Sequence, residues 1–462
     1  MLKMIYTLAL IFYVLSSFFP IAILQTLMAI FALLSVSYSL FYVRGPALIF
    51  GLIFLLLGSS LLFAHHASTA SYVLSFGNML QVLIVFALVP ILSLPIQLGG
   101  YARDIQDMIS QKLKRPAQLY SLTSILSYVF SSFMNLAALP ITYYAIEPAT
   151  RHYPILNKSR FLNRAITHGY AMPLLWAPVT PIVGIVLELT NASYVNVLPY
   201  LITLSFVGLG LDLVIGLFTS RIHRSIKSQS KQSQNETAAA IEKTEQKSKL
   251  SYRFLHVIVA IIILNICIAL FEKWTPLSFL FLVSLLIIPF SLCWCFILGQ
   301  IRPFFTGLKD HFNHHLFKMK NQFFIFLSAG FFITTLHMTH TDQVISHWIS
   351  EIVNFTGVTF FLLTIPFIPL VLAFVGLHPA ISLVLIAEAI HTNLAHVSPI
   401  ILTLTMLGGA IPAFLMGPYN GTLGLMSTIM NVKPTTLSNW NCIYTMIYLF
   451  ILTGGIQILL MF

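Results

Sequence analysis

Four short segments place polar side chains beside helix-breaking residues within long apolar runs. Their sequences are FSSFMNLAALP (130–140), LLWAPVTPIVG (174–184), AFVGLHPAISL (373–383) and LMGPYNGTLGL (415–425). A helix interrupted inside lipid leaves backbone N–H and C=O groups unpaired, which is costly unless these groups line a polar cavity. In such a cavity the free N–H groups and positive helix ends can bind an anion, and free carbonyl groups can bind a cation. We therefore expect a binding site for small ions and no catalytic residues.

The candidate ligands are hydroxyl, amide, imidazole and backbone groups at these four points. They are Ser131, Ser132 and Asn135 in the first segment, Thr180 in the second, Gly376 and His378 in the third, and Asn420 and Thr422 in the fourth. The residues expected to break the helices are Pro178, Pro181, Pro379, Gly417 and Pro418. Oxygen atoms of hydroxyl, amide and carbonyl groups suit Na⁺, while O–H and N–H groups can hydrogen-bond a carboxylate. We expect no resident cofactor and no metal other than Na⁺, held by these same residues.

Each candidate ligand also has a purely structural interpretation. Ser and Thr in membrane helices commonly hydrogen-bond to their own backbone. Amide side chains are costly in lipid, which favours a function for the two Asn residues. His378 is the ionisable residue that we expect at the middle of the membrane, but a lone His can also serve only as a packing donor.

The composition places these segments in a membrane protein. Of the 462 residues, 58% are hydrophobic and 8% are charged, and the mean hydropathy is +0.90. Soluble domains carry roughly 25% charged residues. This contrast excludes a soluble enzyme, a disordered regulator and a nucleic-acid-binding protein. The long continuous apolar runs predict an all-α polytopic protein whose partners are the lipid bilayer and a small solute.

Runs of about 20 apolar residues mark the predicted membrane spans. About 11 transmembrane helices are expected, near 4–19, 22–43, 47–64, 77–97, 163–189, 193–218, 254–271, 276–298, 322–340, 399–430 and 436–461. Two further apolar stretches, 117–146 and 356–390, are too long for one span and too short for two with a turn. Each is interrupted by Pro or Gly. We interpret both as re-entrant hairpins, which enter and leave the membrane on the same face.

The distribution of charge supports a multi-pass protein of the cytoplasmic membrane with its N-terminus in the cytoplasm and its C-terminus outside. In this topology every Lys and Arg except Lys273 lies on the cytoplasmic side, as the positive-inside rule requires. A full crossing by 117–146 would move the basic residues between Arg151 and Lys320 to the outer face. For the second hairpin only Lys433 would move, so its prediction depends on its length and on the repeat described next.

The two halves of the chain share one order of parts: a span, an amphipathic segment, a broken hairpin, a long broken span and a final span. Asp104 pairs with Asp342, Asn135 with His378, and Pro178 with Pro418. Because the hairpins enter from opposite faces in the predicted topology, the repeat is inverted. Such repeats with broken helices are typical of secondary transporters. The alternative is chance recurrence of apolar runs.

The repeat predicts a division of the chain into four parts. They are an extra N-terminal helix (1–21), a first inverted repeat (22–218) with hairpin 117–146 and broken helix 163–189, a cytoplasmic linker (219–252), and a second inverted repeat (253–462) with hairpin 356–390 and broken helix 399–430. The linker is rich in Ser, Gln, Lys and Glu, a composition typical of solvated linkers.

The acidic residues bear on the transported ion. By this count of spans none lies at the four breaks, although Asp212 and Glu388 lie near the ends of predicted segments. A cation–proton antiporter normally needs a carboxylate within the membrane. Its absence favours an anionic substrate. The sequence contains no P-loop, which argues against ATP-driven transport by this chain alone.

The paired hairpins FSSFMNLAALP and AFVGLHPAISL, with the paired breaks WAPVTP and GPYNGT, resemble the ion transporter superfamily of secondary carriers. This superfamily includes divalent-anion/Na⁺ symporters and citrate and gluconate-type permeases. The resemblance implies that Ser131, Ser132 and Asn135 occupy a place where Na⁺ and substrate carboxylate bind. The second tip, with Gly376 and His378, departs from the Ser-Asn-Thr pattern. The resemblance also implies an elevator-type carrier, in many cases a homodimer.

Taken together, these features predict a non-enzymatic secondary active transporter of a small organic anion, a carboxylate, coupled to Na⁺ or H⁺ by symport. Two alternatives stay open. The first is a cation/proton antiporter, which would use Asp212 or Glu388. The second is a non-transporting membrane assembly protein, which would need a catalytic acid or base in a membrane-facing cleft.

Overall fold

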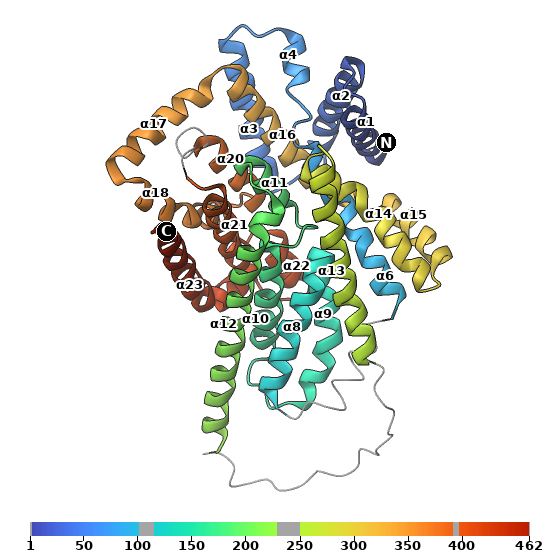
Figure 1. The fold of residues 1–462 in the computed structure, drawn as a ribbon, viewed down its shortest axis with the longest axis vertical. Helices are drawn as coiled ribbons and strands as arrows, with labels where there is room; N and C mark the ends of the chain where they lie inside the picture. The colour runs from blue at the N-terminus through green and yellow to red at the C-terminus, as the bar shows by residue number, and fades with distance from the viewer. Residues whose placement is uncertain (1, 101–114, 229–249, 391–396, 462) are drawn as a thin grey trace.

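A computed structural model describes residues 2–100, 115–228, 250–390 and 397–461, and these residues form helices and no strands. The amphipathic segment 101–114, including Asp104, and most of the predicted linker lie outside the described residues. The α-helices of the first half, seen in Figure 1, are α1 (Leu2–Phe18), α2 (Ala22–Ser39), α3 (Pro46–Ala64), α4 (Thr69–Leu74), α5 (Leu80–Leu88), α6 (Ser93–Leu98), α8 (Pro116–Met134), α9 (Ala138–Ile146), α10 (Lys158–Ala171), α11 (Pro181–Thr190) and α12 (Tyr194–Ser228).

The second half has a similar number of helices. They are α13 (Leu250–Trp274), α14 (Phe279–Ile297), α15 (Ile301–Lys318), α16 (Lys320–Met338), α17 (Thr341–Thr356), α18 (Val358–Thr364), α19 (Ile368–Val375), α20 (Pro379–Ile390), α21 (Pro399–Met416), α22 (Gly421–Met430) and α23 (Pro434–Leu459). Short 3₁₀ segments lie between some of them: η1 (Val89–Leu92), η2 (Asn135–Ala137), η3 (Glu147–His152), η4 (Met172–Leu175) and η5 (Ile365–Phe367).

Among the described residues, ten helical segments are long and apolar enough to cross a membrane, or up to eleven if α16 and α17, bent by 86° at their junction, count as one span. The prediction of an all-α polytopic protein with about 11 spans is therefore confirmed. Several spans are largely unburied within the protein, and in α3 only 22% of the residues are buried. Exposed apolar surface on this scale is stable only if lipid covers it.

Two glycines bring α3 and α16 into close contact. A Cβ atom at Gly51 would lie 2.3 Å from the ring of Phe324, and one at Gly58 would lie 2.6 Å from the ring of Phe331. In lipid, helices associate through close packing at small residues, because no hydrophobic effect drives them together. These glycines therefore hold an outer helix against the rest of the molecule.

The four predicted breaks lie at junctions between helices. α8 and α9 pack side by side and are joined at Asn135, whose φ is 49° (Figure 1). α19 and α20 pack against each other and are joined at Gly376, whose φ of 109° favours glycine. The chain is also interrupted between α10 and α11 and between α21 and α22. The face from which each hairpin enters the membrane stays a prediction.

Elements of the two halves contact each other in reciprocal pairs. α11 packs against α20 of the second half, and α22 packs against α9 of the first. Likewise, α12 packs against α21 and α10 against α23. Each broken helix thus contacts the hairpin of the other half, an arrangement that brings the breaks of both halves into one core.

The boundaries of the predicted linker (219–252) differ from the structure. Helix α12 continues to Ser228, and α13 begins at Leu250, so the ends of the linker are helical. The segment 219–228 contains no Gly or Pro, so nothing in it stops a helix that has already formed within the lipid.

Candidate substrate and ion site

The side chain of Asn420 hydrogen-bonds to the helices on both sides of the second break, α21 and α22. Its Nδ2 atom donates hydrogen bonds to the carbonyl oxygens of Ala413 (2.7 Å) and Phe414 (2.9 Å), at the end of α21. Its Oδ1 atom accepts a hydrogen bond from the backbone N–H of Leu423 (2.9 Å), in the first turn of α22. Both amide protons are therefore used, and one lone pair of Oδ1 is left for a ligand.

Thr180 occupies the corresponding position at the first break, since the offset that pairs Pro178 with Pro418 also pairs Thr180 with Asn420. Thr180 is the N-cap of α11, but its side chain makes no capping hydrogen bond. Its hydroxyl is buried and has no hydrogen-bond partner among the described residues. This hydroxyl and the start of α11 are available to a ligand.

Side chains of neighbouring helices hold the first break in place. The Nε1 atom of Trp176 donates to the hydroxyls of Tyr128 (3.1 Å) and Ser205 (3.2 Å). The hydroxyl of Tyr194 donates to the carbonyl oxygen of Trp176 (2.9 Å), and that of Ser205 donates to the carbonyl oxygen of Met172 (3.0 Å). Two backbone carbonyl groups at this break are thus satisfied by side chains of α12, and the Trp176 side chain joins the break to α8 as well.

The three candidates at the first hairpin tip differ in their contacts. The Ser131 hydroxyl donates to the carbonyl oxygen of Tyr170 (2.7 Å) and so joins α8 to α10. The Ser132 hydroxyl donates to the carbonyl oxygen of Val129 (2.8 Å) in its own helix, as the structural interpretation of such serines expects. Asn135 is half-buried, and its Oδ1 atom accepts a hydrogen bond from the Tyr170 hydroxyl (3.1 Å).

The first tip and the second break meet at Tyr170. A Cβ atom at Gly421 would lie 3.5 Å from the side chain of Leu136. Thr422 lies beside the Tyr170 hydroxyl, and its own hydroxyl is buried without a hydrogen-bond partner among the described residues. Asn135, Tyr170 and Thr422 therefore form one polar group that joins both halves. Tyr170 was not among the sequence candidates, because only the fold brings it to this point.

At the second hairpin tip His378 lies among aromatic rings. Its ring makes edge contacts with Phe86, Phe326 and Phe414, at centroid distances of 5.9, 5.4 and 6.2 Å. Its Nδ1 atom accepts a hydrogen bond from the backbone N–H of Ala380 (3.2 Å). These contacts match the packing role that the sequence left open as an alternative.

The predicted helix breakers lie at the ends of helices. Pro181 and Pro379 are the first residues of α11 and α20, where the missing N–H of proline costs nothing. Pro178 lies between η4 and α11, and Gly417 and Pro418 lie between α21 and α22. A Cβ atom at Gly417 would lie 2.7 Å from the Cβ atom of Ala373, so the second break packs tightly on the second hairpin.

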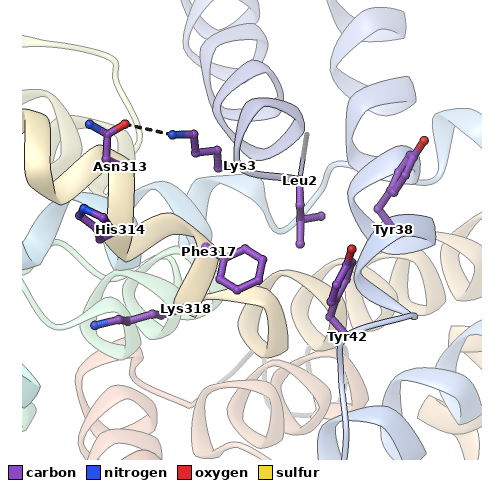
Figure 2. Close-up of a pocket in the computed structure, with 8 residues that line it drawn as sticks. All are labelled: Leu2, Lys3, Tyr38, Tyr42, Asn313, His314, Phe317 and Lys318. Atoms are coloured by element: carbon purple, nitrogen blue, oxygen red, sulfur yellow. Dashed lines mark hydrogen bonds between the residues drawn. The ribbon is translucent and has the colours of Figure 1, made fainter.

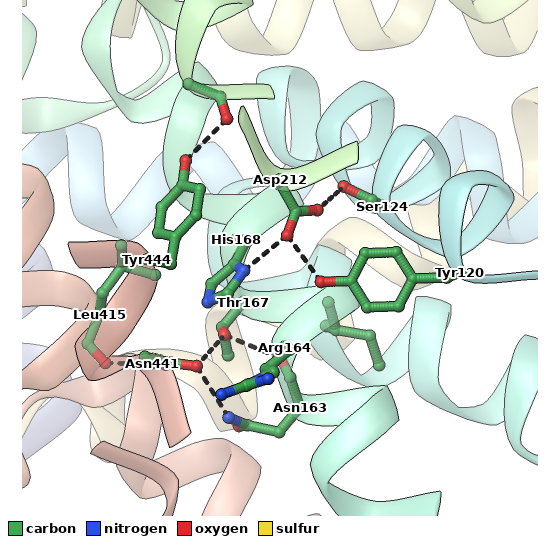
Figure 3. A network of polar contacts seen from close by, with 12 residues as sticks. Tyr120, Ser124, Asn163, Arg164, Thr167, His168, Asp212, Leu415, Asn441 and Tyr444 are labelled. Carbon is green, nitrogen blue, oxygen red and sulfur yellow. Dashed lines mark hydrogen bonds and ion pairs between the residues drawn. The ribbon is translucent and has the colours of Figure 1, made fainter. Parts of the chain in front are cut away.

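An acidic residue that lay near the end of a predicted span is buried between α8, α10 and α12. Asp212 is fully buried and accepts hydrogen bonds of 2.6 Å from Tyr120, Ser124 and His168 (Figure 3). His168, also fully buried, precedes η4 by four residues. His378 is thus one of several ionisable side chains within the bundle. Only the fold shows that His168 and Asp212, which lie in consecutive predicted spans, face each other.

A cavity of about 590 Å³ lies elsewhere, among α1, α2 and α15 (Figure 2). The residues that line it are Leu2, Lys3, Tyr38, Tyr42, Asn313, His314, Phe317 and Lys318. None of the candidate ligands is among them, so this cavity is separate from the site at the breaks.

No protein-family model and no curated protein sequence matches this chain. Among solved structures, the chain is similar to the Alcanivorax borkumensis YdaH transporter, which was described as having an unusual topology. The TM-score is 0.57, the identity is 12%, and the match covers 90% of this chain and 98% of that one. This chain therefore has the fold of a polytopic membrane transporter. The superfamily suggested by the hairpin motifs stays a prediction.

Proposed function

We propose that the protein is a secondary transporter of the cytoplasmic membrane that carries a small organic anion, a carboxylate, together with Na⁺ or H⁺. The shared fold with a transporter supports transport in general. The placement of two interrupted helices in one core supports a solute site between the two halves.

The start of α11 is the observation that carries the choice of an anion. Its N-cap side chain, Thr180, leaves its hydroxyl without a partner among the described residues, although the side chain is only 2% exposed. The start of a helix combines free N–H groups with the positive end of the helix dipole. No acidic residue occurs in 174–184. A carboxylate would therefore accept hydrogen bonds from the Thr180 hydroxyl and from the backbone N–H of Ile182, since Pro181 has no N–H and that of Val183 already bonds to the Thr180 carbonyl.

Asn135, Tyr170 and Thr422 would supply the second part of the site. They offer an amide oxygen and two hydroxyls next to the interrupted backbone of α21 and α22. Hydroxyl and amide oxygens of this kind suit the polar end of a substrate.

Thermal unfolding of the purified chain, followed with and without a panel of mono- and dicarboxylates and Na⁺, tests this proposal. We expect at least one acid to stabilise the wild type, and Thr180→Val to weaken that binding about tenfold, as loss of one hydrogen bond to a charged group would do. Thr203→Val is the matched control, because Thr203 is exposed on α12 and bonds only to its own helix. Unchanged affinity in Thr180→Val, or no stabilisation by any acid, would refute the proposal.

The buried carboxylate of Asp212 favours a cation/proton antiporter as a second candidate. Addition of Na⁺ or K⁺ to proteoliposomes under a pH gradient separates the two functions. An antiporter would collapse the gradient without any organic anion, whereas the proposed carrier would not.

A further inference from the structure

A buried network of polar side chains lies between α8, α10, α12 and α23 (Figure 3). At its centre is Asp212, within the apolar segment Tyr194–Leu217, with no exposed surface. Ionisable side chains at such positions are costly in a membrane and commonly belong to ion or proton pathways. Three hydrogen bonds of 2.6 Å, from Tyr120, Ser124 and His168, stabilise its carboxylate.

His168 uses only one of its two ring nitrogens. Its Nδ1 atom bonds to Asp212, and its ring stacks on Tyr444 at a centroid distance of 4.0 Å. Its Nε2 atom is buried and has no hydrogen-bond partner among the described residues. With the proton of the neutral ring on Nδ1, facing the carboxylate, Nε2 presents an unshared lone pair. A proton taken up there is offset by the charge of Asp212.

The groups that face Asp212 from the surrounding helices are few. They are Tyr120 from α8, Arg164 and His168 from α10, and Tyr444 from α23, while α21 carries no titratable side chain. Arg164 is half-buried, and its Nε atom donates to the carbonyl oxygen of Trp440 (2.7 Å). Of these groups, His168 is the one whose ring nitrogen contacts the carboxyl group of Asp212 directly, at 2.6 Å.

A second group of polar side chains lies next to this network on α10, because Thr167 precedes His168, and it extends to the second break. The Oδ1 atom of Asn441 accepts hydrogen bonds from Asn163 (3.1 Å) and Thr167 (3.3 Å). Its Nδ2 atom donates to the carbonyl oxygen of Leu415 (2.9 Å), next to the last residue of α21. In the other direction, Tyr170 follows His168 by two residues and contacts Asn135. Residues next to His168 on α10 therefore contact both the first hairpin tip, at Asn135, and the side chain of Asn441 that bonds to the end of α21.

We propose that His168 and Asp212 form the proton-binding site that couples transport, with the proton held on Nε2 of His168 and stabilised by the carboxylate of Asp212. The coupling role rests on the proposed function, but proton binding at this pair does not.

Infrared difference spectra between acid and neutral pH test proton binding without any substrate. The sample is the full chain in lipid nanodiscs with ring-labelled histidine. We expect one histidine signal, accompanied by a carboxylate signal, to be lost in both His168→Gln and Asp212→Asn. The matched control is His347→Gln, since His347 pairs with Glu351 on the exposed surface (3.4 Å). Retention of every pH-dependent signal in both variants would overturn the proposal.

Tyr120→Phe provides a second test if His168→Gln or Asp212→Asn does not fold. It keeps both His168 and Asp212 and removes one hydrogen-bond donor to Asp212. Because the removed hydrogen bond ends on the carboxyl group of Asp212, we expect the midpoint of the signal to shift. An unchanged midpoint would contradict the assignment.

Uptake of radiolabelled mono- and dicarboxylates into proteoliposomes tests the coupling. We expect His168→Gln and Asp212→Asn to lose about tenfold or more of the acceleration by a pH gradient, while exchange of labelled for unlabelled anion persists. Full acceleration in both variants would overturn the coupling role. If the wild type transports none of these acids, the proposed function fails, and the infrared titration still decides whether the pair binds a proton.

Discussion

The two helix breaks occupy matching positions in the two halves, yet their backbone groups are satisfied in different ways. At the second break one amide, that of Asn420, bonds to the end of α21 and to the start of α22. At the first break the corresponding residue, Thr180, makes no such bond, and Trp176 joins the break to α8 and α12 instead. Matching positions in a repeat can thus differ in role: one residue stabilises the break, and the other leaves its polar group for a ligand.

Asn420→Ala should have the largest effect, because it removes three hydrogen bonds from a buried break. We expect it to lower the free energy of unfolding by about 2–4 kcal/mol. Denaturant unfolding of the purified protein measures this loss. Thr428→Ala on the exposed face of α22 is the control and should change little. A loss of less than about 0.5 kcal/mol for Asn420→Ala would show that the amide does not hold the break together.

Gly417→Ala should follow, since its Cβ atom would lie 2.7 Å from both Ala373 Cβ and the carbonyl oxygen of Ala413. Overpacking of this kind costs about 1–3 kcal/mol. Gly424→Ala in α22 is the matched control, because its Cβ atom would meet nothing within 4 Å. The control should be neutral or slightly stabilising, as Ala favours helix over Gly. Equal unfolding midpoints for the two variants would contradict the tight contact between the second break and its hairpin.

Trp176→Phe tests whether neighbouring helices hold the first break. It removes the Nε1 donor to Tyr128 and Ser205 while keeping most of the buried ring. We expect a loss of about 1 kcal/mol in the same unfolding measurement. The double variant with Ser205→Ala should lose less than the sum of the two single variants, because both remove the same bond. Strict additivity would argue that the two side chains do not interact.

Thr180→Val should have the smallest effect on stability. It replaces a buried hydroxyl without a partner by a methyl group of similar size, so the free energy of unfolding should stay the same or rise slightly. Anion affinity should nevertheless fall, which would separate binding from folding at this break. A loss of stability like that of Asn420→Ala would instead show that Thr180 is a structural cap.

Composition and local pattern determined the class of this protein and the positions of its helices. With 8% charged residues and long apolar runs, the chain can satisfy its backbone in lipid only as helices. Proline and glycine mark where those helices stop, because their backbone preferences are local. For this reason the expected interruptions near Thr180 and Asn420 coincide with the observed ends of helices.

The roles of individual polar residues depended on contacts between segments far apart in the chain. Asn420 and Thr180 have similar surroundings in the sequence, but only the structure shows that Asn420 bonds to both flanking helices while the hydroxyl of Thr180 is buried without a partner among the described residues. Likewise, nothing near Asp212 in the sequence indicates that its Oδ1 atom lies 2.6 Å from Nδ1 of His168. Hydrogen bonds and buried charges are set by neighbours in space, and the order of the residues does not specify those neighbours until the helices have packed.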